Sequence, residues 1–142
     1  MSTEERSSRE VQMKIQRINP SSLPAPQGFS HAVVAEGRVV FLAGQTGLDI
    51  DGKVVEGGMV AQFEQALSNL LVALEEAGGQ PEQLTSLTIY IVGIDDYLAH
   101  ATELGQVWRR LVGSEYPAMA GIGVSRLWDA DALVEVQGFA VL

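Results

Sequence analysis

The sequence predicts an α+β domain in which a mixed sheet of six strands is covered on one face by two helices. Two observations predict this class. Strand-like alternation of apolar and polar residues recurs around two segments of helical periodicity, and 46% of the 142 residues are hydrophobic. A chain of this length and composition can bury one core without disulfides or metals. We therefore expect residues 11–142 to form a single domain after a disordered, Ser/Glu/Arg-rich tail of residues 1–10.

The first part of the chain carries three predicted strands. Val11, Met13 and Ile15 alternate with polar neighbours, as in a half-buried strand. The proline-rich residues 19–28 then predict an extended connection. Two apolar runs, 32–35 and 39–43, are separated by a short Gly-containing turn, and this spacing predicts a hairpin.

Two segments show helical periodicity. Residues 59–77 place apolar side chains at three- and four-residue steps, and Gly78-Gly79 indicates the end of this helix. A second helix is predicted after Asp95 or Asp96, either of which can cap it, and it ends at Gly113. The apolar stripe of this second helix comprises Tyr97, Ala101, Leu104, Trp108 and Leu111.

Three further strands complete the prediction, at residues 87–91 between the helices and at 118–124 and 133–141 after them. The resulting order is β-β-β-α-β-α-β-β. Two helices cover one face of such a sheet. Since the sequence predicts no third helix, we expect self-association to cover the other face.

Charge and composition disfavour several functional classes. A net charge of −9 argues against nucleic acid as a partner, because phosphate binding needs concentrated positive charge. The adjacent Arg109 and Arg110 are interpreted as a solvated helix face. No apolar run is long enough to cross a membrane. The absence of cysteine fits a cytoplasmic protein, and two isolated histidines predict no metal site.

Seven segments match the blocks of one family in the family's own order. They are residues 26–33, 40–45, 65–70, 73–78, 87–90, 116–118 and 134–140. Together they resemble the Rid family, the YjgF-type enamine and imine deaminases formerly named L-PSP endoribonucleases. The resemblance implies a chorismate-mutase-like fold and a barrel-like homotrimer with small-molecule pockets between subunits. It also implies hydrolysis of enamines or imines such as 2-aminoacrylate, without a metal or organic cofactor.

The resemblance assigns candidate site residues. Glu135 matches a glutamate on the last strand that holds the attacking water in active members, which makes it the candidate catalytic residue. Gln137 shares a strand face with Glu135, because side chains two residues apart point the same way. Gly44 and Gln45 match a segment whose backbone helps to bind the substrate carboxylate, where a glycine permits close approach.

Three polar contacts of active members are replaced in this chain. Met119 stands where active members have an arginine after Pro-Ala, Phe29 replaces a tyrosine, and Ala101 replaces an asparagine. A thioether cannot pair with a carboxylate as a guanidinium does. We therefore expect a wider, more apolar pocket lined by Phe29, Met119 and either Phe41 or Ala43.

Two substitutes for the missing arginine stay open. Arg126 could turn inward from its loop, although an exposed loop arginine is the commoner case. Ser30-His31 offers a polar pair, but without an acid partner or a nucleophile motif. The leading hypothesis is hydrolytic deamination of an enamine or imine larger or less acidic than 2-aminoacrylate. The alternative is a non-catalytic trimer that binds a metabolite or a partner protein, and the acidic charge disfavours ribonuclease activity.

Overall fold

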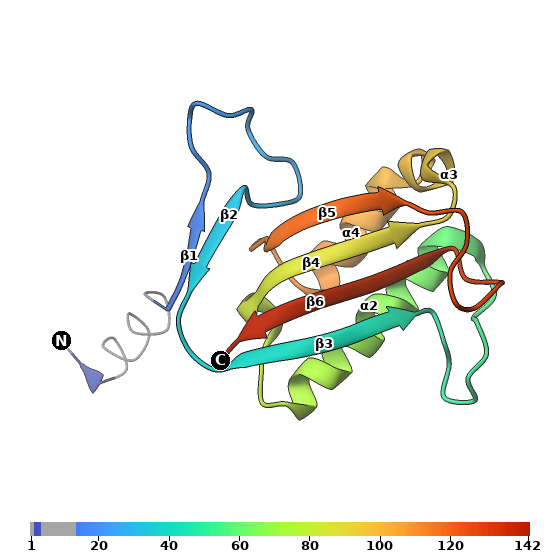
Figure 1. Ribbon diagram of the computed structural model, residues 1–142, viewed down its shortest axis with the longest axis horizontal. Coiled ribbons are helices and arrows are strands. Elements are labelled where there is room, and N and C mark those ends of the chain that lie inside the picture. The colour runs from blue at the N-terminus through green and yellow to red at the C-terminus, as the bar shows by residue number, and fades with distance from the viewer. Residues whose placement is uncertain (1, 4–13) are drawn as a thin grey trace.

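The computed structural model describes residues 2, 3 and 14–142, so most of the predicted tail and positions 11–13 of the first predicted strand lie outside the described residues. The α+β class is confirmed within the described part (Figure 1). The strands are β1 (Ile15–Ile18), β2 (Ala32–Ala35), β3 (Val39–Thr46), β4 (Leu84–Ile91), β5 (Ala118–Gly123) and β6 (Val134–Val141). The helices are α2 (Gly58–Glu76), α3 (Ile94–Ala99) and α4 (Ala101–Leu111), and the 3-10 helix η1 (Pro81–Gln83) precedes β4. Among the described helices, none is long and apolar enough to span a membrane.

The strands form two sheets. The larger sheet has the order β3–β6–β4–β5 with only β4 and β5 parallel, and β1 pairs antiparallel with β2 in the smaller one. A bridge between Ser30 and Ala118 links the two sheets, and there the Ser30 amide donates to the Pro117 carbonyl oxygen at 2.9 Å. Pro117 has no N–H with which to extend this pairing. The predicted continuous sheet of six strands is thus divided at this point.

The predicted hairpin between residues 32–35 and 39–43 is wrong. β2 pairs with β1, and β3 pairs instead with the C-terminal strand β6, where Phe41 lies opposite Phe139. Arg38 exchanges backbone hydrogen bonds with Leu142, at 3.0 and 2.8 Å. The turn at Gly37, with a φ of 140°, therefore carries the chain from one sheet to the other. Short spacing alone misled the prediction, because it does not reveal a better partner almost a hundred residues away.

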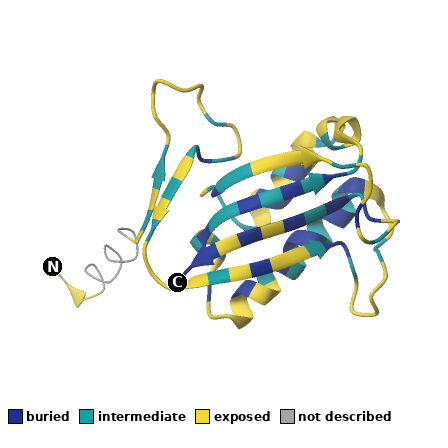
Figure 2. Cartoon of the chain, in the orientation of Figure 1, coloured by how far each residue is buried: buried dark blue, intermediate teal, exposed yellow. Residues whose placement is uncertain are grey.

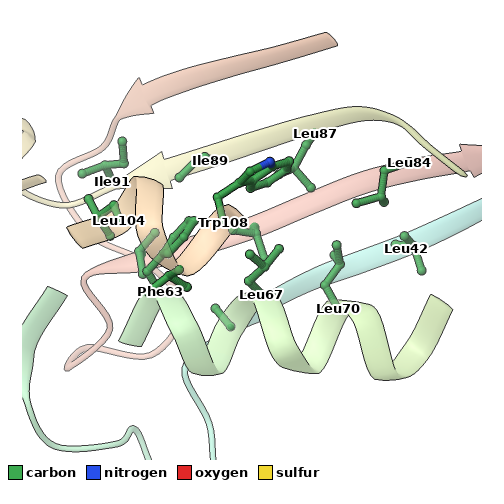
Figure 3. Packing of buried hydrophobic residues seen from close by; sticks show 14 of the residues in the cluster. Leu42, Phe63, Leu67, Leu70, Leu84, Leu87, Ile89, Ile91, Leu104 and Trp108 are labelled. Atoms are coloured by element: carbon green, nitrogen blue, oxygen red, sulfur yellow. The ribbon is translucent and has the colours of Figure 1, made fainter. Parts of the chain in front are cut away.

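Helix α2 supplies the core that covers one face of the larger sheet. Its buried side chains include Phe63, Leu67 and Leu70, and Figure 3 shows them pointing from the helix toward the strands. Leu67 is 0% exposed, and full burial of a leucine side chain contributes about 1.5–3 kcal/mol. The helix ends as predicted at Gly78, whose φ of 94° lets its amide reach the Glu75 carbonyl at 2.9 Å.

The predicted second helix is divided into α3 and α4 at His100. The His100 amide donates to the Tyr97 carbonyl at 3.1 Å, and its Nδ1 lies 2.8 Å from the Asp96 carbonyl oxygen. In an uninterrupted helix the Asp96 carbonyl oxygen would accept a hydrogen bond from the His100 amide. Here the His100 imidazole contacts that oxygen instead. Neither predicted aspartate caps α3, because its N-cap is Gly93 with a φ of 84°. Asp95 and Asp96 lie instead in the first turn, where negative charge complements the helix dipole.

The larger sheet has one covered face and one open face. Figure 1 shows α2, α3 and α4 together on the far side of the strands. Burial alternates along most of β6, where half-buried or exposed positions follow buried ones (Figure 2). The open face carries large exposed hydrophobic side chains, namely Val39, Phe41, Ile122 and Phe139. No described element of the chain covers them, and apolar patches of this kind mark interaction surfaces.

Candidate functional site

A cavity of about 450 Å³ opens between helices α3 and α4 and the adjoining strands β4 and β5. Its walls are mostly apolar and aromatic, with Tyr97 from α3, Trp108 from α4, Ile89 from β4 and Tyr116 from the segment before β5. Trp108 and Tyr116 stack with ring centroids 5.7 Å apart and planes 10° from parallel. The volume lies in the range of small-molecule pockets, which are typically hydrophobic with a few polar groups.

Met119 and Ala101, two of the positions that the sequence resemblance predicts to be replaced, line this cavity. Met119 pairs in register with Leu87 of β4, so its side chain shares the helix-covered face with that buried residue. Ala101 begins α4 and borders the same space. A thioether and a methyl group therefore occupy this part of the wall.

The third replaced position, Phe29, is not among the lining residues. Its ring packs edge-on against the His31 ring, with centroids 5.1 Å apart. The two preceding residues, Gln27 and Gly28, border the cavity instead. Gly28 has a φ of 75°, which is costly for any residue with a side chain, so the turn into β2 depends on glycine here.

Glu135 lies on the open face of the sheet, opposite the helices. It pairs in register with Thr46 on one side and with Tyr90 on the other. Its carboxyl group rests over Gly44, because a β-carbon on that glycine would lie 3.0 Å from the carboxyl carbon and 3.2 Å from each oxygen. Gly44 therefore provides the space in which this carboxyl group sits.

Two features of its surroundings raise the pKa of the Glu135 carboxyl group above its ordinary value. Burial raises the pKa of the Glu135 carboxyl, and the negative charge of Asp129 raises it further. Asp129 is itself held by Thr46, whose hydroxyl donates to its Oδ2 at 2.8 Å. A raised pKa brings a carboxyl group closer to neutral pH than an ordinary glutamate, which suits it to proton transfer.

The other candidate binding residues fall on different faces. The Tyr90 hydroxyl contacts the Gln137 Oε1 at 3.2 Å, so Gln137 shares the open face with Glu135 as predicted. Phe41 lies on that face with 76% of its surface exposed, and its ring packs edge-on against Phe139. Gln45 differs, because it lines a separate hollow beside α2. The pairing shifts by one residue between Leu42 and Gln45, and this bulge turns Gln45 to the other side.

Met119 and Glu135 therefore lie on opposite faces of one sheet within a single chain. The sheet backbone separates the cavity from the carboxyl group. A ligand in the cavity cannot touch Glu135 of the same chain without passing through this layer. Any site that uses both residues needs them from two copies.

The two substitutes considered for the missing arginine have other partners. Ser30 is buried and its hydroxyl donates to the Tyr116 carbonyl oxygen at 2.7 Å, while the His31 Nε2 lies 2.9 Å from the Pro24 carbonyl oxygen. Both residues thus fix the loop that borders the cavity. Arg126 is exposed and its Nε donates to the Leu127 carbonyl at 3.3 Å. Across the described residues, no cluster of three or more His, Asp or Glu side chains is placed to hold a metal ion.

The sequence did not reveal several residues that surround the cavity and Glu135. The helical periodicity assigns Tyr97 and Trp108 to a core stripe and Arg109 to a solvated face, yet all three line the cavity. Asp129 carries no signal in the sequence, because its effect on Glu135 depends on the loop before β6. The helical spacing of Tyr97 and Trp108 does not distinguish a cavity wall from a packed core.

Comparison with known proteins places this fold in one class. A protein of the conserved Rid family, YyfB from Yersinia pestis, superposes with a TM-score of 0.82 at 32% sequence identity, covering 92% of this chain and 100% of that chain. A family model described as Endoribonuclease L-PSP matches residues 20–142. The chain belongs to this family, and the resemblance noted from its sequence is confirmed.

Curated relatives agree with this assignment. A RutC family protein of Drosophila melanogaster is 32% identical over 132 residues, which cover 92% of this chain and 90% of the relative. A 2-iminobutanoate/2-iminopropanoate deaminase of Capra hircus is 31% identical over 126 residues, covering 87% and 88% respectively. The similarity thus extends over nearly the whole of each protein.

Proposed function

We propose that this chain is a cytoplasmic deaminase of the Rid type, which hydrolyses enamines or imines in a pocket between the subunits of a homotrimer. The observation that carries the proposal is the position of Glu135. Its carboxyl group has a raised pKa, rests over Gly44 and lies on a sheet face that no described element covers. Relatives named as 2-iminobutanoate/2-iminopropanoate deaminases support the reaction class.

The Met119 cavity and Glu135 lie on opposite faces of the sheet, and this placement supports the proposed homotrimer. A second copy that covers the open face buries Phe41 and Phe139 and brings its own groups toward Glu135. In the proposed trimer, the Met119 cavity of one subunit meets the Glu135 of its neighbour. Closed rotational symmetry then gives every subunit both roles, so each interface forms one complete pocket.

In the proposed reaction, water adds to the carbon of the C=N bond while the nitrogen takes up a proton. The carboxylate of Glu135 accepts a proton from the attacking water, and the carboxylic acid returns it to nitrogen. The carbinolamine then collapses, so that the C–N bond breaks and a ketone and ammonia leave. An enamine first gains a proton at carbon and loses one from nitrogen to give the imine. Neither a metal nor an organic cofactor takes part.

The cavity walls suggest the choice of substrate. Met119 offers no charge and Ala101 little bulk, so the space near them suits a larger apolar group. We therefore expect 2-aminoacrylate and its imine, 2-iminopropanoate, to be poor substrates. An imine with an aromatic side chain fills the cavity better and buries more apolar surface.

The test generates imines in situ with an amino-acid oxidase, from phenylalanine and separately from alanine, and follows their loss. We expect faster hydrolysis of the phenylalanine-derived imine, and a loss of about 100-fold or more in Glu135→Gln, since the acid–base group is removed. Glu76→Gln, at an exposed carboxylate on α2, is the matched control and should keep full activity. Unchanged turnover in Glu135→Gln, or a preference for the alanine-derived imine, would contradict the proposal.

A non-catalytic role is the second candidate, and the loss of polar groups at Met119 and Ala101 favours it. Such a protein binds a metabolite without transforming it. It is distinguished by the absence of imine turnover in the unmutated protein together with a ligand-dependent rise in Tm. Ribonuclease activity, which the family description names, is disfavoured by the net charge of −9.

A further inference from the structure

Arg109 is a cation at the cavity without a partner. It lies in the last turn of α4, lines the cavity, and is exposed. Within the described part of the chain, Arg17 pairs with Glu115 and Arg110 pairs with Glu64, but no hydrogen bond or ion pair engages Arg109. Its guanidinium is therefore available to an anion.

The face of α4 explains why this guanidinium reaches the cavity. Ala101, Gly105 and Arg109 follow one another at four-residue steps, so they lie on one side of the helix. Side chains in a helix lean toward its N-terminus, and the Arg109 Nη1 lies 3.7 Å from the position of a β-carbon on Gly105. The absence of a side chain at Gly105 keeps open the path between this group and the space beside Ala101.

We propose that the cavity binds a small carboxylate with an aromatic or branched apolar body, and that Arg109 supplies the cation which Met119 cannot. The carboxylate lies at the mouth beside Arg109, and the apolar body packs between Tyr97, Met119 and the stacked Trp108 and Tyr116. The inference rests on the proposed function in that this ligand is the substrate, an imino acid larger than 2-aminoacrylate that keeps its carboxylate. Arg109 is then a specificity-determining residue.

A purely structural role for Arg109 makes a different prediction. A cation in the last turn of a helix stabilises the helix dipole, and Arg110 in the same turn serves that role equally. A structural role therefore changes stability but leaves ligand selectivity untouched. Selectivity between a charged and a neutral ligand separates the two roles.

The test measures binding of 3-phenylpropanoate and of its neutral analogue 3-phenylpropanamide to the intact protein by calorimetry. We expect the carboxylate to bind about tenfold more tightly than the amide, as for a charge-assisted hydrogen bond at a partly exposed site. Arg109→Gln should abolish this preference, whereas Arg110→Gln should retain it. Circular dichroism and Tm establish that both variants are folded.

Each result is decisive for the inference. Equal binding of the two probes, binding of neither, or a preference that persists in Arg109→Gln would overturn it. Failure of the proposed function is separate, because these probes undergo no reaction. Carboxylate-selective binding without imine turnover leaves the anion site intact, whereas turnover that is indifferent to Arg109→Gln supports the deaminase and removes the anion site.

Discussion

The two faces of strand β6 differ in what covers them. Val134, Val136 and Ala140 are each 0% exposed beneath the helices. Glu135 and Phe139, which alternate with them, face the other way, where Glu135 is half-buried and Phe139 is 39% exposed. The helix-covered face is completed by the chain itself, whereas the open face leaves a carboxyl group and apolar rings for the proposed second copy to cover. The difference teaches that one chain builds the core, while the proposed site needs two chains.

The largest expected effect comes from removing a packed side chain on the helix-covered face. Leu67→Ala should lower the free energy of unfolding by about 2–5 kcal/mol, because a cavity replaces a fully buried side chain. The loss should be the same at all protein concentrations, since the contact lies within one chain. Val72→Ala, at a residue of α2 that is 66% exposed, is the control. Denaturant unfolding at several protein concentrations measures both.

A loss in Leu67→Ala that depends on protein concentration would mean that this face also belongs to an interface. A loss as large in Val72→Ala would show that α2 responds to any truncation.

The role of the open face in assembly can be tested by placing a charged side chain on it. Phe41→Asp should dissociate the oligomer, with the dissociation constant raised about 100-fold or more, because association would bury an unpaired carboxylate. The free energy of unfolding of the dissociated chain should change by less than about 0.5 kcal/mol, since Phe41 is exposed there. Analytical ultracentrifugation measures the oligomer.

Val72→Asp places the same charge on the outer side of α2 and should leave assembly unchanged. A protein that is monomeric before mutation, or a trimer that tolerates Phe41→Asp, would count against the proposed assembly.

The smallest effect concerns the charge beside Glu135. Asp129→Asn should lower the pKa of Glu135 toward its ordinary value, because a neighbouring negative charge is removed while the acceptor for Thr46 is kept. Since burial is the larger cause, part of the shift should remain. Asp131→Asn, two residues along the same loop, is the control. A carbon-13 titration of the Glu135 carboxyl group measures the pKa directly.

The direction in which pH changes the stability follows from the raised pKa of Glu135. Glu135 has a higher pKa in the folded chain than in the unfolded chain, so its contribution to stability is full below the unfolded pKa. That contribution is lost as the pH rises through the folded pKa. The loss should be smaller in Asp129→Asn. A Glu135 pKa that stays unchanged in this variant would leave burial as the sole cause.

The sequence by itself determined what depends on short-range periodicity. The three- and four-residue spacing of the apolar residues in α2 predicted its length and its stop at Gly78. The two-residue alternation of β6 was enough to place Glu135 and Gln137 on one face. Such patterns are reliable because the period of the backbone fixes which side chains share a face.

The tertiary structure alone decided which segments meet. It paired β3 with β6 rather than β2, because the end of the chain offered the better partner. It turned Gln45 away from the face of Phe41 through a bulge. It also interrupted the second helix at His100, whose Nδ1 lies at the Asp96 carbonyl oxygen. It also set Met119 and Glu135 on opposite faces and aimed Arg109 at a cavity. These outcomes depend on contacts between residues far apart in the chain, and no local period encodes such contacts.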